Sequence, residues 1–189
     1  MGEKLILASG SPRRRELLEM AGIEHVVHVP EIDEVILPGE TPVAYTSRLA
    51  RTKACAVAPQ HPGSWVLGAD TVVVVDGHIV GKPRDSEEAE EMLSDMAGRR
   101  HEVLTSVALV NGDRVEERSS TTSVWMQPLD RDTVRSYVAT GEPMDKAGAY
   151  AAQGIGAILI DHIDGDFFTV MGLPLELVIE LLELVGFER

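Results

Sequence analysis

Apolar residues along this chain fall into two recurring patterns, short β-branched runs and longer stretches with helical spacing. Lys4–Ala8 (KLILA) predicts a buried strand, and residues 41–58 predict a helix with an apolar stripe. Strands that alternate with helices favour an α/β fold, and a later pair of antiparallel strands makes the sheet mixed. Further strands are expected at 23–30, 71–75, 78–80, 101–110 and 114–126, and further helices at 12–21, 86–97, 131–139 and 175–185.

The stretch Gly68–Pro83 (GADTVVVVDGHIVGKP) carries the strongest local signal. A β-rich run meets Asp76-Gly77 and then a second run, which predicts a β-hairpin. A two-residue turn would set Thr71 opposite Lys82, whereas a three-residue loop would set Asp70 opposite Lys82. We favour the three-residue loop, because Asp followed by Gly suits the end of a type I turn plus bulge. Either register brings a carboxylate and an ammonium to the open end of the hairpin, as a reactive pair or as a solvated surface ion pair.

Composition and charge narrow the class of protein. The chain of 189 residues is expected to form a single domain, 1–189, with no membrane span and no signal peptide, which places it in the cytoplasm. Cys55 is the only cysteine, so neither an internal disulfide nor a thiolate zinc site is expected. A formal net charge of −14 disfavours nucleic-acid binding, which needs a basic face.

Basic residues are nevertheless concentrated in two places. Arg13, Arg14 and Arg15 follow Ser9-Gly10-Ser11-Pro12, where a strand passes into a helix. The helix dipole disfavours cations in a first turn, so the three arginines indicate a site for a phosphate-rich anion, with a solvated basic turn as the alternative. The second place is the run that contains Arg48, Arg51 and Lys53. Lys53 falls on the apolar stripe of its helix, where its side chain either extends to solvent or points at a ligand.

Two further regions carry candidate chemistry. Glu31, Asp33 and Glu34 follow a predicted strand and could hold Mg²⁺, although a solvated loop explains them equally well. Residues 144–173 contain five glycines together with Asp145, Lys146 and Gln153, a density that suggests backbone approaching a ligand.

Taken together, these stretches resemble the Maf family of nucleoside triphosphate pyrophosphatases. The motifs LILASGSPRRRELL, EIDE, RLARTKA, GADTVVVVDGHIVGKP, AGAYAAQG and GDFFTVMGLPL stand in the family's order over nearly the whole chain. The resemblance implies an elongated mixed sheet flanked by helices, with two lobes and a central cleft, like that of inosine triphosphate pyrophosphatases. It also implies hydrolysis of a nucleoside triphosphate to the monophosphate and pyrophosphate with a divalent metal cation, Mg²⁺ or Mn²⁺.

The resemblance also implies residue roles. Asp70 matches the proton acceptor and Glu34 matches the acidic cleft position. Together with Lys82 they are the expected catalytic residues, and Asp70 and Glu34 are also the expected metal ligands. The positions that hold the substrate correspond to Ser9, Arg13, Arg14, Lys53 and Lys82, and Lys82 is expected to keep the pKa of Asp70 low. Arg13, Thr71 and Gln153 match the positions that separate base preferences, and SPRR, ADT and AAQG look like the branch for dTTP and UTP. Thr52 departs from the Glu of many relatives, which leaves a salt bridge at that position open.

The chemistry that follows is attack of water at the α-phosphorus, with Asp70 as base and cations on the phosphate oxygens. Such an enzyme would remove canonical or modified pyrimidine nucleotides. One rival is a nucleotide-sensing regulator of cell division without essential turnover. A second keeps the enzyme class but takes a modified or purine triphosphate. The family hints at a homodimer, by analogy only.

Overall fold

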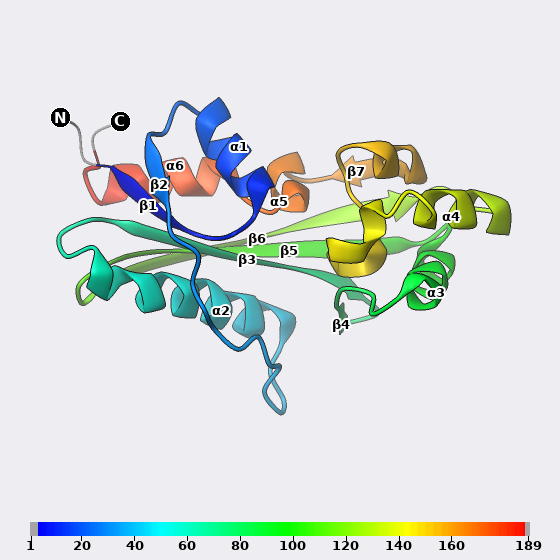
Figure 1. Cartoon of the computed structure of the whole chain (residues 1–189), viewed down its shortest axis with the longest axis horizontal. Coiled ribbons are helices and arrows are strands. Elements are labelled where there is room, and N and C mark those ends of the chain that lie inside the picture. The colour runs from blue at the N-terminus through cyan, green and yellow to red at the C-terminus, as the bar shows by residue number, and fades with distance from the viewer. Residues whose placement is uncertain (1–3, 188–189) are drawn as a thin grey trace. The chain divides into compact units, whose positions relative to one another are not determined.

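A computed structural model describes residues 4–187, which form a mixed α/β fold built on a seven-stranded sheet (Figure 1). The strand order is β2-β1-β3-β5-β6-β7, and β4 pairs with β3 outside this path. Strand β1 is parallel to β2 and β3, while β3–β4 and β6–β7 are antiparallel, so the expected mixed sheet is confirmed. The strands are β1 Leu5–Ala8, β2 His25–Val27, β3 Val66–Val75, β4 His78–Val80, β5 Arg100–Asn111, β6 Arg114–Met126 and β7 Ile160–Asp164.

The α-helices in residues 4–187 follow the sequence expectation closely, except that the short helix at 167–171 was not expected. They are α1 Pro12–Met20, α2 Pro42–Val57, α3 Ser86–Met96, α4 Arg131–Val138, α5 Phe167–Met171 and α6 Leu175–Leu184. Thr41, Asp85 and Asp130 cap α2, α3 and α4 by accepting a hydrogen bond from a backbone N–H three residues later. Ser11 occupies the N-cap position of α1 but makes no such bond. None of the helices in residues 4–187 is long and apolar enough to cross a membrane.

The glycine-rich region does not form a single loop. It consists of three short 3-10 helices, η2 Glu142–Asp145, η3 Ala147–Ala149 and η4 Ile155–Leu159, followed by β7 and α5. Strand β7 was missed in the sequence, because its five residues lie between glycines and have no apolar alternation over a useful length.

The chain divides into two compact units. Unit 1 contains residues 4–70, 105–120 and 172–187, and unit 2 contains 71–104 and 121–171. The arrangement of the units, and with it the expected cleft, stays a prediction.

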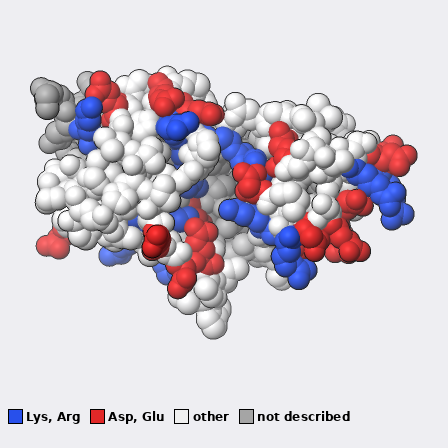
Figure 2. All heavy atoms as spheres, viewed as in Figure 1, with Lys and Arg blue, Asp and Glu red and all other residues white. Residues whose placement is uncertain are grey.

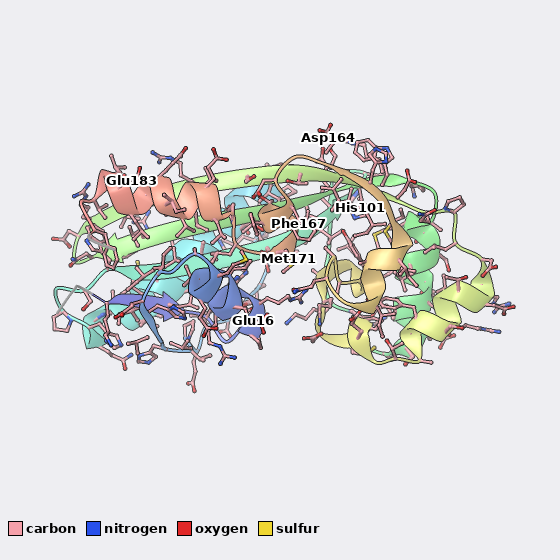
Figure 3. All side chains as sticks on the ribbon, turned by 90° about the horizontal axis from the view of Figure 1, so that it is seen from above. Glu16, His101, Asp164, Phe167, Met171 and Glu183 are labelled. Carbon is pink, nitrogen blue, oxygen red and sulfur yellow. The ribbon has the colours of Figure 1, made fainter. Side chains whose placement is uncertain are left out.

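Unit 1 is a layered structure in which helices cover both faces of the sheet. Helix α2 lies on one face, and α1 and α6 lie on the other (Figure 1); Glu16 of α1 and Glu183 of α6 are labelled on that second face in Figure 3. A small core joins the two layers beneath α2 and consists of Ile6, Ala8, Ala54, Val57, Val66 and Val110. The apolar stripe read from the sequence is therefore the face that α2 buries, and Leu49 and Ala50 are fully buried on it.

Unit 2 has its own core, which α3 and α4 share with the adjoining parts of β3, β5 and β6. Leu93 of α3 and Val134 of α4 are buried in this core. The acidic side chains of α3 lie on its outer surface, and the face shown in Figure 2 has acidic and basic side chains interspersed. His101 of β5, labelled in Figure 3, is almost completely buried, and burial lowers its pKa from the usual 6.5 to about 4.

Strand β3 belongs to both units, which divide between Asp70 and Thr71. Its first part pairs with β1, ending at Ala8 with Gly68, and its last part pairs with β4, beginning at Val73 with Val80. The hairpin register is Val75 with His78, which is the two-residue turn and not the three-residue loop that we favoured. The physical reason is the turn itself: Asp76 and Gly77 both have positive φ, 49° and 81°, as a type I′ turn requires.

Gly68 allows α2 to lie unusually close to β3. A Cβ at this position would collide with the carbonyl oxygen of Ala50 and lie 2.9 Å from the backbone nitrogen of Ala54. Both obstacles are backbone atoms of a buried helix, which cannot rotate away as a side chain can.

We expect Gly68→Ala to lower the free energy of unfolding by about 3 kcal/mol, because overpacking a buried contact between backbones forces the helix off the sheet. Urea denaturation measures the change. Gly81→Ala is the matched control, since nothing lies within 4 Å of its added Cβ. Equal stability of the Gly68 variant and the wild type would contradict the close approach of α2 to β3.

Candidate active site

Two carboxylates of unit 1 meet at the ammonium group of one lysine. The Nζ of Lys53 lies 2.6 Å from Oδ1 of Asp70 and 2.7 Å from Oε1 of Glu34. Lys53 and Asp70 are 8% and 5% exposed, whereas Glu34 is exposed to solvent. The cluster is thus a buried ion pair with a second carboxylate on its solvent side.

The positions of these groups follow from local structure. Tyr45, Leu49 and Lys53 are spaced by four residues, so they share the face of α2 that packs on the sheet. Asp70 follows Gly68 by two residues, and its side chain lies on the same face of β3 where the glycine admits α2. The close approach of helix and strand therefore lets the ammonium of Lys53 reach the carboxylate of Asp70.

Burial dominates the electrostatics of Asp70. Removal of this carboxyl from water raises its pKa above the ordinary value, while Lys53 and Arg14 oppose the rise and Glu34 adds to it. Burial likewise raises the pKa of Tyr45, with smaller contributions from the charges of Asp70 and Glu34. A carboxylate with a raised pKa is better suited to accept a proton near neutral pH than an exposed one.

Arg14 holds the end of β1, the middle of β3 and a C-terminal turn together. Its guanidinium donates to the carbonyls of Ala69 and Gly172, each at 2.8 Å, and to the hydroxyl of Ser9 at 3.2 Å. Burial lowers the pKa of Arg14, and the negative charges of Asp70 and Glu34 counteract that effect. The sequence analysis assigned Arg14 to phosphate alone, whereas its hydrogen bonds also give it a structural role that local sequence does not reveal.

The segment that carries Glu34 is held against α2 by residues that the sequence analysis did not single out. The hydroxyl of Tyr45 donates to the carbonyl of Glu34 at 3.4 Å. Arg48 donates two hydrogen bonds to the carboxylate of Glu40, at 2.6 and 2.7 Å, and a third to the carbonyl of Val35 at 2.9 Å. The spacing of Tyr45 to Lys53 on the helix was the available signal for the first of these contacts.

Four of the predicted site residues remain to be placed. Arg13 is half-buried in the first turn of α1, beside Arg14. Thr71, Lys82 and Gln153 belong to unit 2, and Lys82 and Gln153 are exposed. The expectation that Lys82 keeps the pKa of Asp70 low is wrong: that pKa is raised by burial, and the lysine that opposes the rise is Lys53.

The carboxylates of Asp70 and Glu34 fit a divalent metal in part. Both point at a single position, and carboxylate oxygens are the ligands that Mg²⁺ and Mn²⁺ prefer. No group of three or more His, Cys, Asp or Glu side chains converges on a metal position within residues 4–187. Two protein carboxylates suffice for Mg²⁺ when phosphate oxygens and water complete its shell, so the donor set suits a metal that binds with a phosphate ligand.

The fold and this cluster define an α/β protein with a buried acid, counter-cations and an arginine-rich helix start, a combination suited to phosphate esters or anhydrides. The Ham1 protein of Staphylococcus aureus has a similar fold, with a TM-score of 0.52 over 84% of this chain and 80% of that one at 16% sequence identity. This likeness concerns the fold alone.

The chain belongs to the Maf-like protein family, whose model matches residues 4–185. A dTTP/UTP pyrophosphatase of Symbiobacterium thermophilum is 52% identical over 98% of this chain and 95% of its own length. Proteins of the same name from Myxococcus xanthus and Pyrococcus furiosus are 48% and 41% identical, each over 96% of this chain and over 92% and 95% of their own lengths.

Lys53→Met is expected to move the acidic limb of the pH profile of kcat/KM to higher pH. Lys53 lowers the pKa of Asp70, so its removal raises that pKa further, and the carboxylate form is reached only at higher pH. Initial rates with UTP between pH 5 and 9 measure the limb. Arg51→Met removes an exposed cation from the same helix and serves as the control. An active Lys53 variant with an unshifted limb would show that Asp70 is not the group that titrates.

Proposed function

We propose that this protein is a nucleoside triphosphate pyrophosphatase that hydrolyses dTTP and UTP to the monophosphate and pyrophosphate. The observation that carries the proposal is the contact of Lys53 with both Asp70 and Glu34 in unit 1. It is supported by relatives named dTTP/UTP pyrophosphatase, which align with this chain over nearly their full length. The physiological role that we propose is removal of canonical or modified pyrimidine nucleotides.

In the proposed reaction, Asp70 accepts a proton from a water molecule that attacks the α-phosphorus. A bond forms between the water oxygen and phosphorus, the bond to the bridging oxygen breaks, and pyrophosphate leaves with that electron pair. The raised pKa of Asp70 supports the role of base, because a more basic carboxylate takes the proton more readily.

Cations supply most of the remaining stabilisation, since the reaction concentrates negative charge on the phosphate oxygens. We assign this role to Lys53 and Arg13, with Ser9 and Arg14 shaping the turn on which the phosphates would rest. Ser9 accepts a hydrogen bond from the backbone nitrogen of Ser11 at 3.2 Å, so this turn is already ordered before α1 begins. Lys82 is assigned to phosphate by its motif.

Asp70 and Glu34 would hold a divalent cation, which would neutralise negative charge on the phosphate oxygens. Lys53 already occupies the position at which the two carboxylates converge. Binding of such a cation therefore requires the ammonium of Lys53 to move toward the incoming phosphates, where its charge is equally useful. We also propose a homodimer, by analogy with the family only, and a cytoplasmic location, from the sequence alone.

We expect turnover of dTTP and UTP in the presence of Mg²⁺ or Mn²⁺, with pyrophosphate as a product. When the reaction is run in ¹⁸O-labelled water, the label should enter the monophosphate, because the α-phosphorus is the atom attacked. Mass spectrometry of the two products reads the result. Label in pyrophosphate would place the attack at the β-phosphorus.

Binding of both nucleotides without pyrophosphate release would favour a nucleotide-sensing regulator. Preferential turnover of purine or modified triphosphates would show that the substrate is not dTTP or UTP.

Gln153→Glu is expected to lower kcat/KM for UTP by about tenfold or more, because a glutamine amide can both donate to and accept from the 2,4-dioxo edge of uracil, whereas a carboxylate only accepts. Steady-state kinetics with UTP and dTTP measure the loss. The control is Glu176→Gln, which exchanges a carboxylate and an amide at an exposed position of α6, away from Gln153 in the sequence, and should leave kcat/KM unchanged. Unchanged turnover of UTP would remove Gln153 from the base site.

A further inference from the structure

The loop that carries Gln153 is built around a single carboxylate in unit 2. Glu142 accepts hydrogen bonds from the backbone nitrogens of Ile155 at 3.1 Å and Gly156 at 2.7 Å. These bonds lower the pKa of Glu142, although its partial burial opposes the shift. The carboxylate therefore fixes the backbone directly after Gln153.

Tyr137 of α4 fixes the backbone on the other side. Its hydroxyl accepts a hydrogen bond from the backbone nitrogen of Ala151 at 3.1 Å and bonds to the side chain of Glu142. One residue earlier, the hydroxyl of Tyr150 lies 2.7 Å from Nε2 of buried His101. Gln153 thus lies on a short segment that is held before it by Tyr137 and Tyr150 of the unit's core and after it by half-buried Glu142.

The glycines of the loop show how closely it fits these anchors. A Cβ at Gly154 would collide with the carboxylate of Glu142, and a Cβ at Gly156 would lie 2.5 Å from the hydroxyl of Tyr137. Gly154 also has φ of +90° and ψ of −148°, which only glycine adopts readily. The backbone of the loop therefore packs directly against the carboxylate of Glu142 and the hydroxyl of Tyr137.

We propose that Glu142 and Tyr137 are specificity-positioning residues, which act on base selection through the conformation of the Gln153 loop. The inference rests on the proposed function, because it takes Gln153 as the side chain that reads the base. A carboxylate that binds two adjacent N–H groups fixes the backbone from which the side chain of Gln153 extends, and so restricts the directions open to its amide. Selection by hydrogen bonds needs such a direction, because a mobile amide satisfies a 4-oxo and a 4-amino edge equally well.

The test compares kcat/KM for UTP, whose base has a 4-oxo group, with kcat/KM for CTP, whose base has a 4-amino group. Glu142→Gln keeps the size of the side chain but presents one oxygen to two N–H groups, so the UTP/CTP ratio should fall about tenfold or more. Turnover of CTP should be retained. In the Gln153→Ala background, Glu142→Gln should change the ratio no further, because the group that it positions is gone.

Asp166→Asn is the matched control within unit 2. Asp166 also accepts hydrogen bonds from two backbone nitrogens, those of Phe168 and Thr169, at 3.0 and 2.8 Å, but outside this loop. The Asp166→Asn substitution should lower Tm and leave the ratio of kcat/KM for UTP to that for CTP unchanged. A loss of stability alone therefore cannot reproduce the effect expected of Glu142→Gln.

Tyr137→Phe provides a second variant if Glu142→Gln does not fold, and it should lower the same ratio. If Gln153→Ala lowers the ratio but neither Glu142→Gln nor Tyr137→Phe does, this inference alone is overturned. If Gln153→Ala leaves the ratio unchanged while UTP is still hydrolysed, the base-reading role of Gln153 and this inference fall together. Absence of turnover in the wild type overturns the proposed function first.

Discussion

The ammonium of Lys53, held between Asp70 and Glu34, is the interaction on which the site in unit 1 depends. Two carboxylates that share a position repel each other, and a buried one is costly to ionise without a counter-charge. Lys53 supplies that charge from a helix that is itself fixed by apolar packing. The raised pKa of Asp70 shows that burial outweighs the counter-charge, and this balance gives a carboxyl group the basicity that proton transfer requires.

Strand β3 provides the frame for this balance because its pairing changes along its length. Residues 66–68 pair with β1, residues 73–75 pair with β4, and Asp70 lies in the interval between the two registers. In that interval the carbonyl of Ala69 accepts a hydrogen bond from Arg14. A side chain thus satisfies a backbone group where neither of the two strands does, and it brings a positive charge close to Asp70 in doing so.

Regular elements of this fold were predictable, whereas the partners of the site residues were not. The helical spacing around Leu49 and the caps Thr41, Asp85 and Asp130 depend on neighbours within one turn, so the sequence reveals them. The lysine beside Asp70 depends on how closely α2 approaches β3, which Gly68 decides through contacts with distant backbone. Local pattern therefore led to Lys82, from the same hairpin, in place of Lys53.

The same limit applies to the hairpin turn and the loop of Gln153. Asp-Gly suits two turn types, and the structure has the one in which Asp76 and Gly77 both adopt positive φ, a choice that the two residue types alone do not reveal. The density of glycines indicated backbone in close contact with another group, and that group proved to include Glu142, a side chain of the protein itself. A glycine-rich stretch reports a close approach without identifying what approaches.

The hydrogen bond from Arg14 to Gly172 joins residues 158 positions apart, and this separation has a consequence for how the protein is made. A ribosome delivers Arg14 first, and the carbonyl that completes its surroundings emerges only 158 residues later. Contacts of such long range are slow to form, and domains fold as units once their segments are available. The surroundings of Arg14 in unit 1 can therefore be completed only after residue 172 has been translated.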